Sequence, residues 1–180
     1  MPKFGLIHIV TGLPGSGKTK VAKIIARSVN GLLINTDDVR NILFARDGFT
    51  GAFDFTPNQL EVIYKVLPVV MTYVTEVAPS KDIVFDGTFR LNEQRETVRR
   101  AANKLNREVS VVVVSADERD IKDRIDHRHT AEGHQATFET YLKVRGVYEI
   151  PIDAWAIDNS GKLADLAQKV YVYLQSKGLT

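Results

Sequence analysis

LIHIVTGLPGSGKT, at residues 6–19, is a short apolar run followed at once by a glycine-rich turn. Residues 6–11 are rich in side chains that favour β-strands. After the turn, residues 21–29 carry apolar side chains at the spacing of one helix face. The segment therefore predicts a strand, a tight turn and a helix in direct succession.

The turn matches the phosphate-binding pattern G-x-x-x-x-G-K-[ST], known as Walker A. Glycines let backbone N–H groups turn inward around phosphate oxygens, and the following helix directs its positive end at the same anion. Lys18 can then reach the β- and γ-phosphates, and the Thr19 hydroxyl can ligate Mg²⁺. A glycine-rich turn without a nucleotide is the alternative, but the position between strand and helix favours phosphate binding. The expected nucleotide-binding residues are Gly12, Leu13, Pro14, Gly15, Ser16, Gly17, Lys18 and Thr19.

The rest of the chain repeats the alternation of strand and helix. Further strands are predicted at residues 32–35, 83–85, 109–114 and 154–157. Helices are predicted from residue 37 onward and at residues 57–77, 92–105, 117–127, 136–148 and 163–175, with a polar loop at 128–135. Strands separated by helices imply an α/β fold whose parallel sheet is covered on both faces.

Composition limits the class of protein. With 180 residues, of which 44% are hydrophobic, the chain is long enough to bury the core of one domain spanning residues 1–180. The 24 basic and 22 acidic residues are spread along the chain, which does not indicate bulk coating of nucleic acid. The lack of cysteine excludes disulfides and Cys-based metal sites. We expect a cytoplasmic protein, because the sequence contains no signal-peptide pattern and no apolar stretch of roughly 18 residues.

The sequence NTDDVR at residues 35–40 follows the second predicted strand. Its side chains are therefore expected at the same sheet edge as the phosphate loop. Asp37 is a candidate general base for an attacking hydroxyl, and Arg40 could orient that base or a substrate phosphate. Alternatively, Thr36 or Asp37 caps the next helix and Asp38 favours its positive end. The nearby phosphate loop favours the catalytic interpretation of Asp37.

Asp86 directly follows the apolar run of the third predicted strand. A carboxylate in that position is typical of a Walker B acid, which holds Mg²⁺ or its waters. The alternative is a strand-terminal aspartate that forms a turn. We expect Thr19 and Asp86 to be the metal ligands.

Three arginines follow the fourth predicted strand: Arg119, Arg124 and Arg128. Arg124 and Arg128 are four residues apart and share a helix face. Such a pair could clamp a triphosphate and neutralise the charge that develops during transfer. A solvated helix, in which the intervening aspartates pair with the arginines, is the alternative.

Other conspicuous side chains are expected to be structural. We predict that His8 and Trp155 lie in the core, and that Arg95, Arg99 and Arg100 face solvent beside Glu93 and Glu96. The histidines of the lid region, His127, His129 and His134, have no cysteine beside them and are not expected to form a metal site.

Four sequence blocks, taken in order, resemble the P-loop kinases of the polynucleotide kinase and zeta-toxin-like type. They are GLPGSGKT at 12–19, INTDDVRNIL at 34–43, VFDGTF at 84–89 and DRIDHR at 123–128. The resemblance implies a three-layer P-loop NTPase fold with a five-stranded parallel sheet in the order 2-3-1-4-5 and a helical lid at residues 119–148. It also implies that Asp37 activates a hydroxyl with support from Arg40, that Arg124 and Arg128 are lid arginines, and that residues 158–161 abut adenine.

The motifs together predict an ATP- and Mg²⁺-dependent kinase that transfers the γ-phosphate to a hydroxyl acceptor. The predicted catalytic residues are Lys18, Asp37, Arg40, Arg124 and Arg128, and Arg124 is also expected to contact the nucleotide.

The acceptor is left open among a polynucleotide 5′-hydroxyl, a sugar, a nucleoside-like compound and an antibiotic. The modest net charge and the lack of accessory phosphatase and ligase domains weaken the interpretation that the acceptor is a polynucleotide. Residues 44–56, with Phe49, Phe53 and Phe55, are candidates for the acceptor pocket. The alternative functions are a P-loop ATPase or switch acting through a partner, and a non-catalytic nucleotide-binding module.

Overall fold

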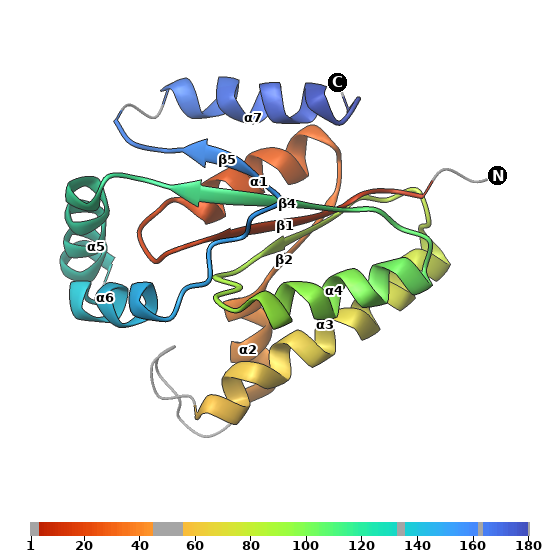
Figure 1. Cartoon of the computed structure of the whole chain (residues 1–180), viewed down its shortest axis with the longest axis horizontal. Helices are drawn as coiled ribbons and strands as arrows, with labels where there is room; N and C mark the ends of the chain where they lie inside the picture. The colour runs from red at the N-terminus through yellow and green to blue at the C-terminus, as the bar shows by residue number, and fades with distance from the viewer. Residues whose placement is uncertain (1–3, 45–55, 133–135, 162–163, 180) are drawn as a thin grey trace.

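The structure is a computed structural model that describes residues 4–44, 56–132, 136–161 and 164–179. Within these ranges the chain forms one sheet with helices on both faces and two further helices beyond one end (Figure 1). Residues 45–55 of the predicted pocket segment, with Phe49, Phe53 and Phe55, and His134 of the predicted lid lie outside the described residues.

The sheet confirms the predicted α/β class and strand order. Its strands are β1 (Ile7–Gly12), β2 (Leu32–Asn35), β3 (Ile83–Asp86), β4 (Val109–Ser115) and β5 (Ala154–Asp158). All neighbouring pairs are parallel, in the order β2-β3-β1-β4-β5. Every residue of the central strand β1 is buried, as expected for a parallel strand covered on both faces.

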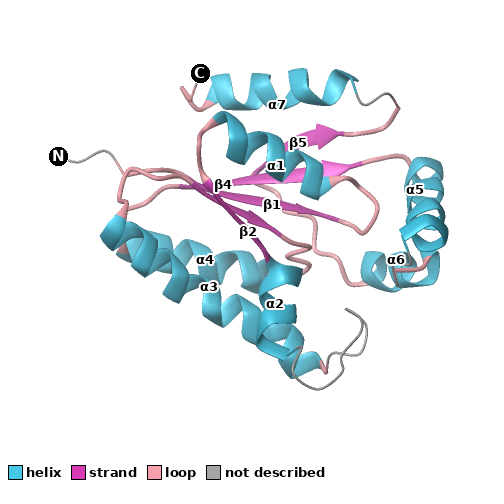
Figure 2. Ribbon diagram, turned by 180° about the vertical axis from the view of Figure 1, so that it is seen from behind, coloured by secondary structure: helices cyan, strands magenta, loops and turns pink. Residues whose placement is uncertain are grey.

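Helices cover both faces of the sheet (Figure 2). In the described ranges the helices are α1 (Lys18–Ser28), α2 (Thr36–Phe44), α3 (Pro57–Val77), α4 (Asn92–Lys104), α5 (Glu118–Glu132), α6 (Phe138–Gly146) and α7 (Ala164–Ser176), of which α5 and α6 lie beyond one end of the sheet. One prediction of local structure is wrong: residues 128–132 belong to α5 and not to a loop. Polar composition suggested a loop, but the sequence contains neither glycine nor proline between the start of α5 and Gly133.

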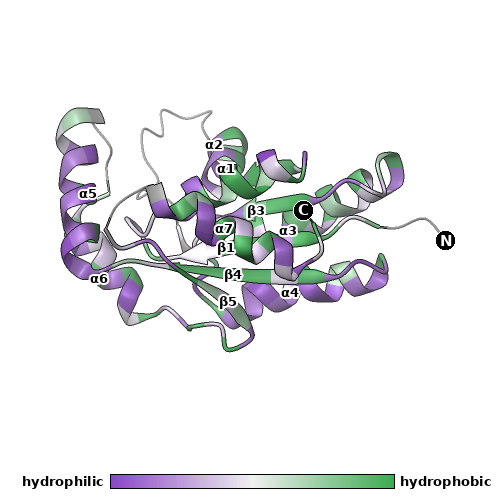
Figure 3. Ribbon diagram, turned by 90° about the horizontal axis from the view of Figure 1, so that it is seen from above, coloured by the Kyte–Doolittle hydropathy of each residue, from purple (hydrophilic) through white to green (hydrophobic). Residues whose placement is uncertain are grey.

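Two hydrophobic cores lie on opposite sides of the sheet. One packs α1 and α7 against the strands, and the other packs α3 and α4. A small third cluster joins α5 and α6 and includes Ile121, Ile125 and Tyr141, with Leu13 of the phosphate loop packed against it. Figure 3 shows hydrophobic strands and largely hydrophilic α5 and α6. These two helices therefore contact the sheet mainly where it carries the phosphate loop.

Two predictions about single residues have opposite outcomes. His8 is fully buried, as predicted, and its ring nitrogens lie 2.7 Å from the Tyr173 hydroxyl and 3.1 Å from the Asp82 carboxylate. Trp155 is not a core residue, because 37% of it is exposed. It lies on the edge strand β5, where helices cover less of the sheet.

Among the helices of the described ranges, none has both the length and the apolar character needed to cross a bilayer.

Candidate active site

The phosphate loop connects β1 to α1 at the carboxyl end of the sheet. Gly15 and Gly17 have φ angles of +82° and +89°, a left-handed conformation that favours glycine. Space is also restricted, because a Cβ atom on Gly17 would lie 2.1 Å from Asn159 Nδ2. Gly17 caps α1 without a side-chain hydrogen bond, and the first turn of that helix contains no acidic residue. The positive end of α1 is thus left open to an anion.

Asp86 lies beside this loop, because β3 pairs with β1 in a register that places it opposite Val10. Its side chain is fully buried, and Oδ2 accepts a hydrogen bond of 2.6 Å from Asn35 Nδ2. Oδ1 is also buried and has no hydrogen-bond partner in the described part of the chain. Burial raises the pKa of Asp86 above its ordinary value, while nearby Lys18, Thr19 and Asn35 oppose that rise.

Asp86 Oδ1, which has no hydrogen-bond partner among the described residues, bears on whether the residues here fit a magnesium ion. A buried carboxylate oxygen is unfavourable unless a ligand or water satisfies it. Asp86 and Thr19 supply carboxylate and hydroxyl oxygens, the hard donors that Mg²⁺ prefers. In the described ranges no group of three or more His, Cys, Asp or Glu could hold a metal, but Mg²⁺ commonly uses one or two carboxylates together with phosphates and waters. The residues therefore fit this ion.

Helix α2 begins on the same edge, and its cap differs from the predicted one. Asn35, not Thr36 or Asp37, caps the helix: its Oδ1 accepts from the backbone N–H groups of Asp37 and Asp38 at 2.8 and 3.1 Å. The Asp37 carboxylate is therefore not used for capping. It is 59% exposed and accepts a 2.5 Å hydrogen bond from Nη1 of the buried Arg40.

Side chains from α3 and from the loop after β3 adjoin this pair. Burial raises the pKa of the Tyr64 hydroxyl to about 12, while the neighbouring charge of Arg40 lowers it. Glu61 accepts hydrogen bonds from Arg90 at 3.3 Å and from Gln94 at 3.0 Å. Sequence reasoning missed these residues. Arg90 follows the motif of the third strand and could have been found there, whereas nothing in the helical pattern of α3 marks Glu61 or Tyr64.

Arg95 corrects another prediction, because it is only 2% exposed. Its guanidinium donates to the backbone carbonyls of Phe89 at 2.5 Å and Glu149 at 2.9 Å. Phe89 has a φ of +41°, so the loop is strained at this point. The prediction of a solvent-facing Arg95 is wrong because two separate loops turn backbone carbonyls inward, and the guanidinium donates to both. Arg100 does face solvent, where it pairs with Glu93 at 2.5 Å.

The same loop is bonded to the segment that follows α6. The Glu149 N–H donates to the Arg90 carbonyl at 2.8 Å, and the Asn92 N–H donates to the Glu149 carboxylate at 2.5 Å. One residue earlier, the Tyr148 hydroxyl lies 3.0 Å from the Thr11 hydroxyl at the end of β1. The chain leaving α6 is thus attached to the sheet edge before it enters β5.

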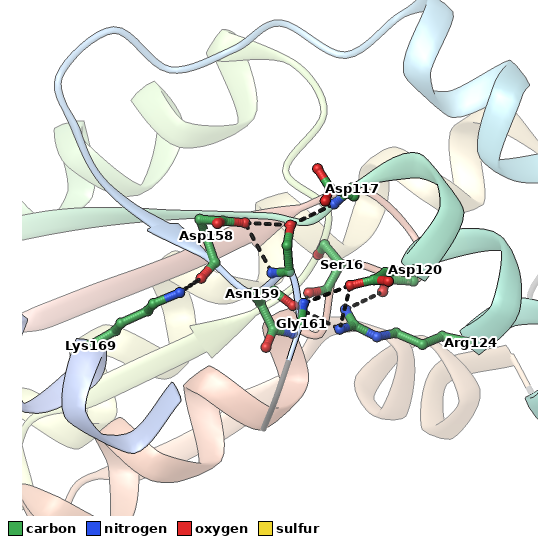
Figure 4. A network of polar contacts seen from close by, with 10 residues as sticks. Ser16, Asp117, Asp120, Arg124, Asp158, Asn159, Gly161 and Lys169 are labelled. Atoms are coloured by element: carbon green, nitrogen blue, oxygen red, sulfur yellow. Dashed lines mark hydrogen bonds and ion pairs between the residues drawn. The ribbon is translucent and has the colours of Figure 1, made fainter. Parts of the chain in front are cut away.

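Arg124 joins three segments around the phosphate loop (Figure 4). From α5 its guanidinium donates to the carbonyl of Asn159 at 2.7 Å and to that of Gly15 at 3.4 Å, and it lies 3.7 Å from the Asp120 carboxylate. The side chain of Asn159, which lies in the 158–161 segment that the resemblance places against adenine, donates to the Ser16 carbonyl at 2.8 Å. The phosphate loop, α5 and the loop after β5 therefore meet at one point.

The other predicted arginines are less engaged. Arg128 is half-buried, one turn beyond Arg124 on α5, and its Nε donates to the Arg124 carbonyl at 3.4 Å. Arg119 is exposed. The structure thus brings Lys18, Thr19 and Asp86 together, places Asp37 and Arg40 at the same edge, and sets Arg124 against the loop from the other side.

Comparisons with known proteins agree with this arrangement. Residues 7–151 match the family model described as AAA domain. Similar solved structures include a gluconokinase from Sinorhizobium meliloti 1021, which is 19% identical, with 98% of this chain and 95% of that one covered and a TM-score of 0.69. A sugar kinase from Janibacter sp. HTCC2649 is 18% identical, with coverage of 98% and 96% and a TM-score of 0.69.

A third similar structure is the Mycobacterium tuberculosis APS kinase CysC in complex with AMPPNP and APS. It is 19% identical, with 97% of this chain and 99% of that one covered and a TM-score of 0.68. A search of curated proteins finds no significant match. The predicted resemblance to P-loop kinases is confirmed, while the polynucleotide kinase and zeta-toxin-like subtype is not specified. The chain has the P-loop kinase fold and belongs to the AAA domain family.

Proposed function

We propose that this protein is an ATP- and Mg²⁺-dependent kinase that transfers the γ-phosphate of ATP to a hydroxyl group. The observation that carries the proposal is the Asp37–Arg40 pair, which lies at the same sheet edge as the phosphate loop and Asp86. A protein that only binds nucleotide needs the loop alone. A kinase also needs an acceptor-side base, and Asp37 is available because Asn35 caps the helix.

On the nucleotide side, the loop from Gly12 to Thr19 would hold the phosphates through backbone N–H groups, with Lys18 on the β- and γ-phosphates. Thr19 and Asp86 would hold Mg²⁺, and the unpartnered Asp86 oxygen supports that role. When bound, the ion supplies positive charge against the β- and γ-phosphate oxygens.

On the acceptor side, Asp37 would accept the proton of the attacking hydroxyl. Arg40 holds the Asp37 carboxylate in place through a 2.5 Å charge-assisted hydrogen bond. Catalysis would then depend mainly on the position of the hydroxyl and on charge stabilisation at the phosphoryl group.

The two arginines of α5 would divide the work. Arg124 uses its donors on the carbonyls of Gly15 and Asn159, beside the loop that we assign to adenine. We therefore assign Arg124 to nucleotide binding beside the adenine, with support of the transition state from that direction. We assign Arg128 to the phosphates. In this proposal, residues 1–180 form one kinase domain whose lid is made by α5 and α6.

We propose a small molecule as the acceptor. The gluconokinase, the sugar kinase and the APS kinase among the similar structures support this choice. The near balance of 24 basic and 22 acidic residues also favours it over a polynucleotide, which usually requires a basic track.

The test is a screen of hydroxyl acceptors with the whole protein, Mg²⁺ and radiolabelled ATP. The panel contains sugars, sugar acids, nucleosides, hydroxyl-bearing antibiotics and 5′-hydroxyl oligonucleotides. Label transferred to a small molecule supports the proposal, and label on the oligonucleotide selects the polynucleotide branch. ATP hydrolysis without transfer to any acceptor would instead favour a P-loop ATPase or switch.

A further inference from the structure

Asn35 connects the two halves of the proposed site. It is the last residue of β2 and lies opposite Asp86 in the register of β2 with β3. Its Nδ2 donates to Asp86 Oδ2 at 2.6 Å, and its Oδ1 accepts from the N–H groups of Asp37 and Asp38 at 2.8 and 3.1 Å. One side chain is therefore bonded both to the metal-side carboxylate and to the first turn of the acceptor-side helix.

The chemistry at each end fixes the orientation of the amide. Backbone N–H groups require an acceptor, whereas an ionised carboxylate requires a donor. An aspartate could cap the helix but would place an oxygen against Asp86. A serine could also cap the helix, but its single short hydroxyl cannot span both partners. An amide at this position satisfies both ends at once.

The hydrogen bond from Asn35 also determines which carboxylate oxygen of Asp86 is available to a ligand. It occupies Oδ2 and leaves the buried Oδ1 as the carboxylate oxygen without a partner in the described residues. The direction of Oδ1 is then set by the amide, which is itself held by the start of α2. Hydrogen bonds of this kind orient metal ligands and commonly change metal affinity by about 10–100-fold when removed.

We propose that Asn35 is a positioning residue that sets the direction of the Asp86 carboxylate toward Mg²⁺ and holds it in register with Asp37. This inference rests on the proposed function, since it assigns Asp86 to the metal. It extends that function by naming a residue that touches neither the nucleotide nor the acceptor and yet determines how the metal side and the acceptor side are aligned.

Two substitutions separate positioning from capping. Asn35→Ser keeps a hydroxyl that can cap α2 and adds no charge, but it removes the donor to Asp86. Asn35→Asp keeps the capping oxygen and replaces the donor with a like-charged group. Asn41→Ser, at an exposed position of α2, is the matched control for the same chemical change in the same helix.

The experiment measures ATP affinity of the whole protein by calorimetry with MgCl₂ and with EDTA, and the free energy of unfolding in urea. For the wild type and Asn41→Ser, Mg²⁺ is expected to strengthen ATP binding. Asn35→Ser is expected to reduce that gain by about tenfold, and Asn35→Asp by more, while metal-free ATP affinity stays close to the wild-type value.

The possible failures can be told apart. If the wild type binds ATP no better with Mg²⁺, the proposed function is overturned together with the inference. If the wild type shows the gain and both Asn35 variants retain it in full, only the inference is overturned. It is also overturned if both variants lose most of their folding free energy in urea, because Asn35 would then be a structural cap.

Discussion

The nucleotide side and the acceptor side that we propose for this site are built in different ways. The nucleotide side is made largely of backbone from one continuous stretch, Gly12 to Thr19, closed by contacts from Arg124 and Asn159. The acceptor side is made of side chains from β2, α2, α3 and the loop after β3. A site made of consecutive backbone groups leaves a contiguous motif, while a site made of scattered side chains does not. The four predictions below test this contrast.

The largest effect is expected from Lys18→Ala. This change removes the cation that we place on the β- and γ-phosphates, so ATP turnover should fall by about 10³-fold while the fold remains intact. The measurements are steady-state turnover and thermal unfolding. Lys20→Ala, at an exposed position of α1, is the control. Unchanged turnover in Lys18→Ala would refute the assignment of the loop.

Asp37→Asn should damage only the acceptor side. The amide cannot act as a general base, so transfer to the acceptor should fall by about 10²-fold or more, while ATP affinity remains at the wild-type level. The measurements are the rate of acceptor phosphorylation and the ATP affinity by calorimetry. Asp38→Asn, at the next exposed position, should leave both unchanged. A matching loss in the two variants would mean that the effect comes from charge at the start of α2 and not from a base.

Gly17→Ala tests how closely the nucleotide side is packed. Both Gly17 and Gly161 have left-handed φ angles, +89° and +77°, so an alanine at either position carries a backbone cost of about 1–2 kcal/mol. Of these two, only at Gly17 would the new Cβ meet another atom, Asn159 Nδ2 at 2.1 Å. A Cβ added at Gly161 would have no atom of another segment within 4 Å in the described structure.

ATP affinity should therefore fall at least about tenfold in Gly17→Ala and change little in Gly161→Ala, with a lower free energy of unfolding in both. Calorimetry and urea denaturation measure the two effects. Equal ATP affinities in the two variants would show that the loop tolerates a displaced Asn159.

The last of the four predictions, Arg95→Met, concerns stability and not nucleotide binding. The change leaves the carbonyls of Phe89 and Glu149 without their buried donor, which should lower the free energy of unfolding by about 2 kcal/mol. Urea denaturation gives the value, and Arg100→Met, on the exposed part of α4, should change little. ATP affinity should be preserved in both variants, because Arg95 supports the acceptor side. A loss of ATP affinity in Arg95→Met would show that the nucleotide side and the acceptor side are not independent of each other.

Local patterns were sufficient to locate the strands, most of the helices and the phosphate loop, whereas the strand order was implied by the resemblance to P-loop kinases. The alternation of apolar runs and helical spacing located the strands, and the position of Asp86 after β3 was visible in the chain. Asp37 and Arg40 could be paired because they are three residues apart. In each case the information lies within a few neighbouring residues.

Contacts between distant segments could not be predicted in this way. The double role of Asn35 depends on the pairing of β2 with β3, which brings it to Asp86 across 51 residues of sequence. Arg95 is buried because the carbonyl of Glu149, 54 residues away, turns toward it. Its own helix offers acidic neighbours that suggest a solvated surface. Polar groups that satisfy remote backbone atoms leave no periodic signal in the sequence.

The attachment of Glu149 has a mechanical consequence for α5 and α6. Glu149 is bonded to Arg90 and Asn92, and Tyr148 to Thr11, so displacement of the two helices meets a fixed point soon after α6 ends at Gly146. Any rotation is expected to be concentrated at Gly146 and Val147, where Gly146 has open space around it in the described structure. The loop that carries Arg90 would then keep its place whether the two helices stand open or closed. In the proposed function, an acceptor would therefore meet this loop in the same place before and after any movement of α5 and α6.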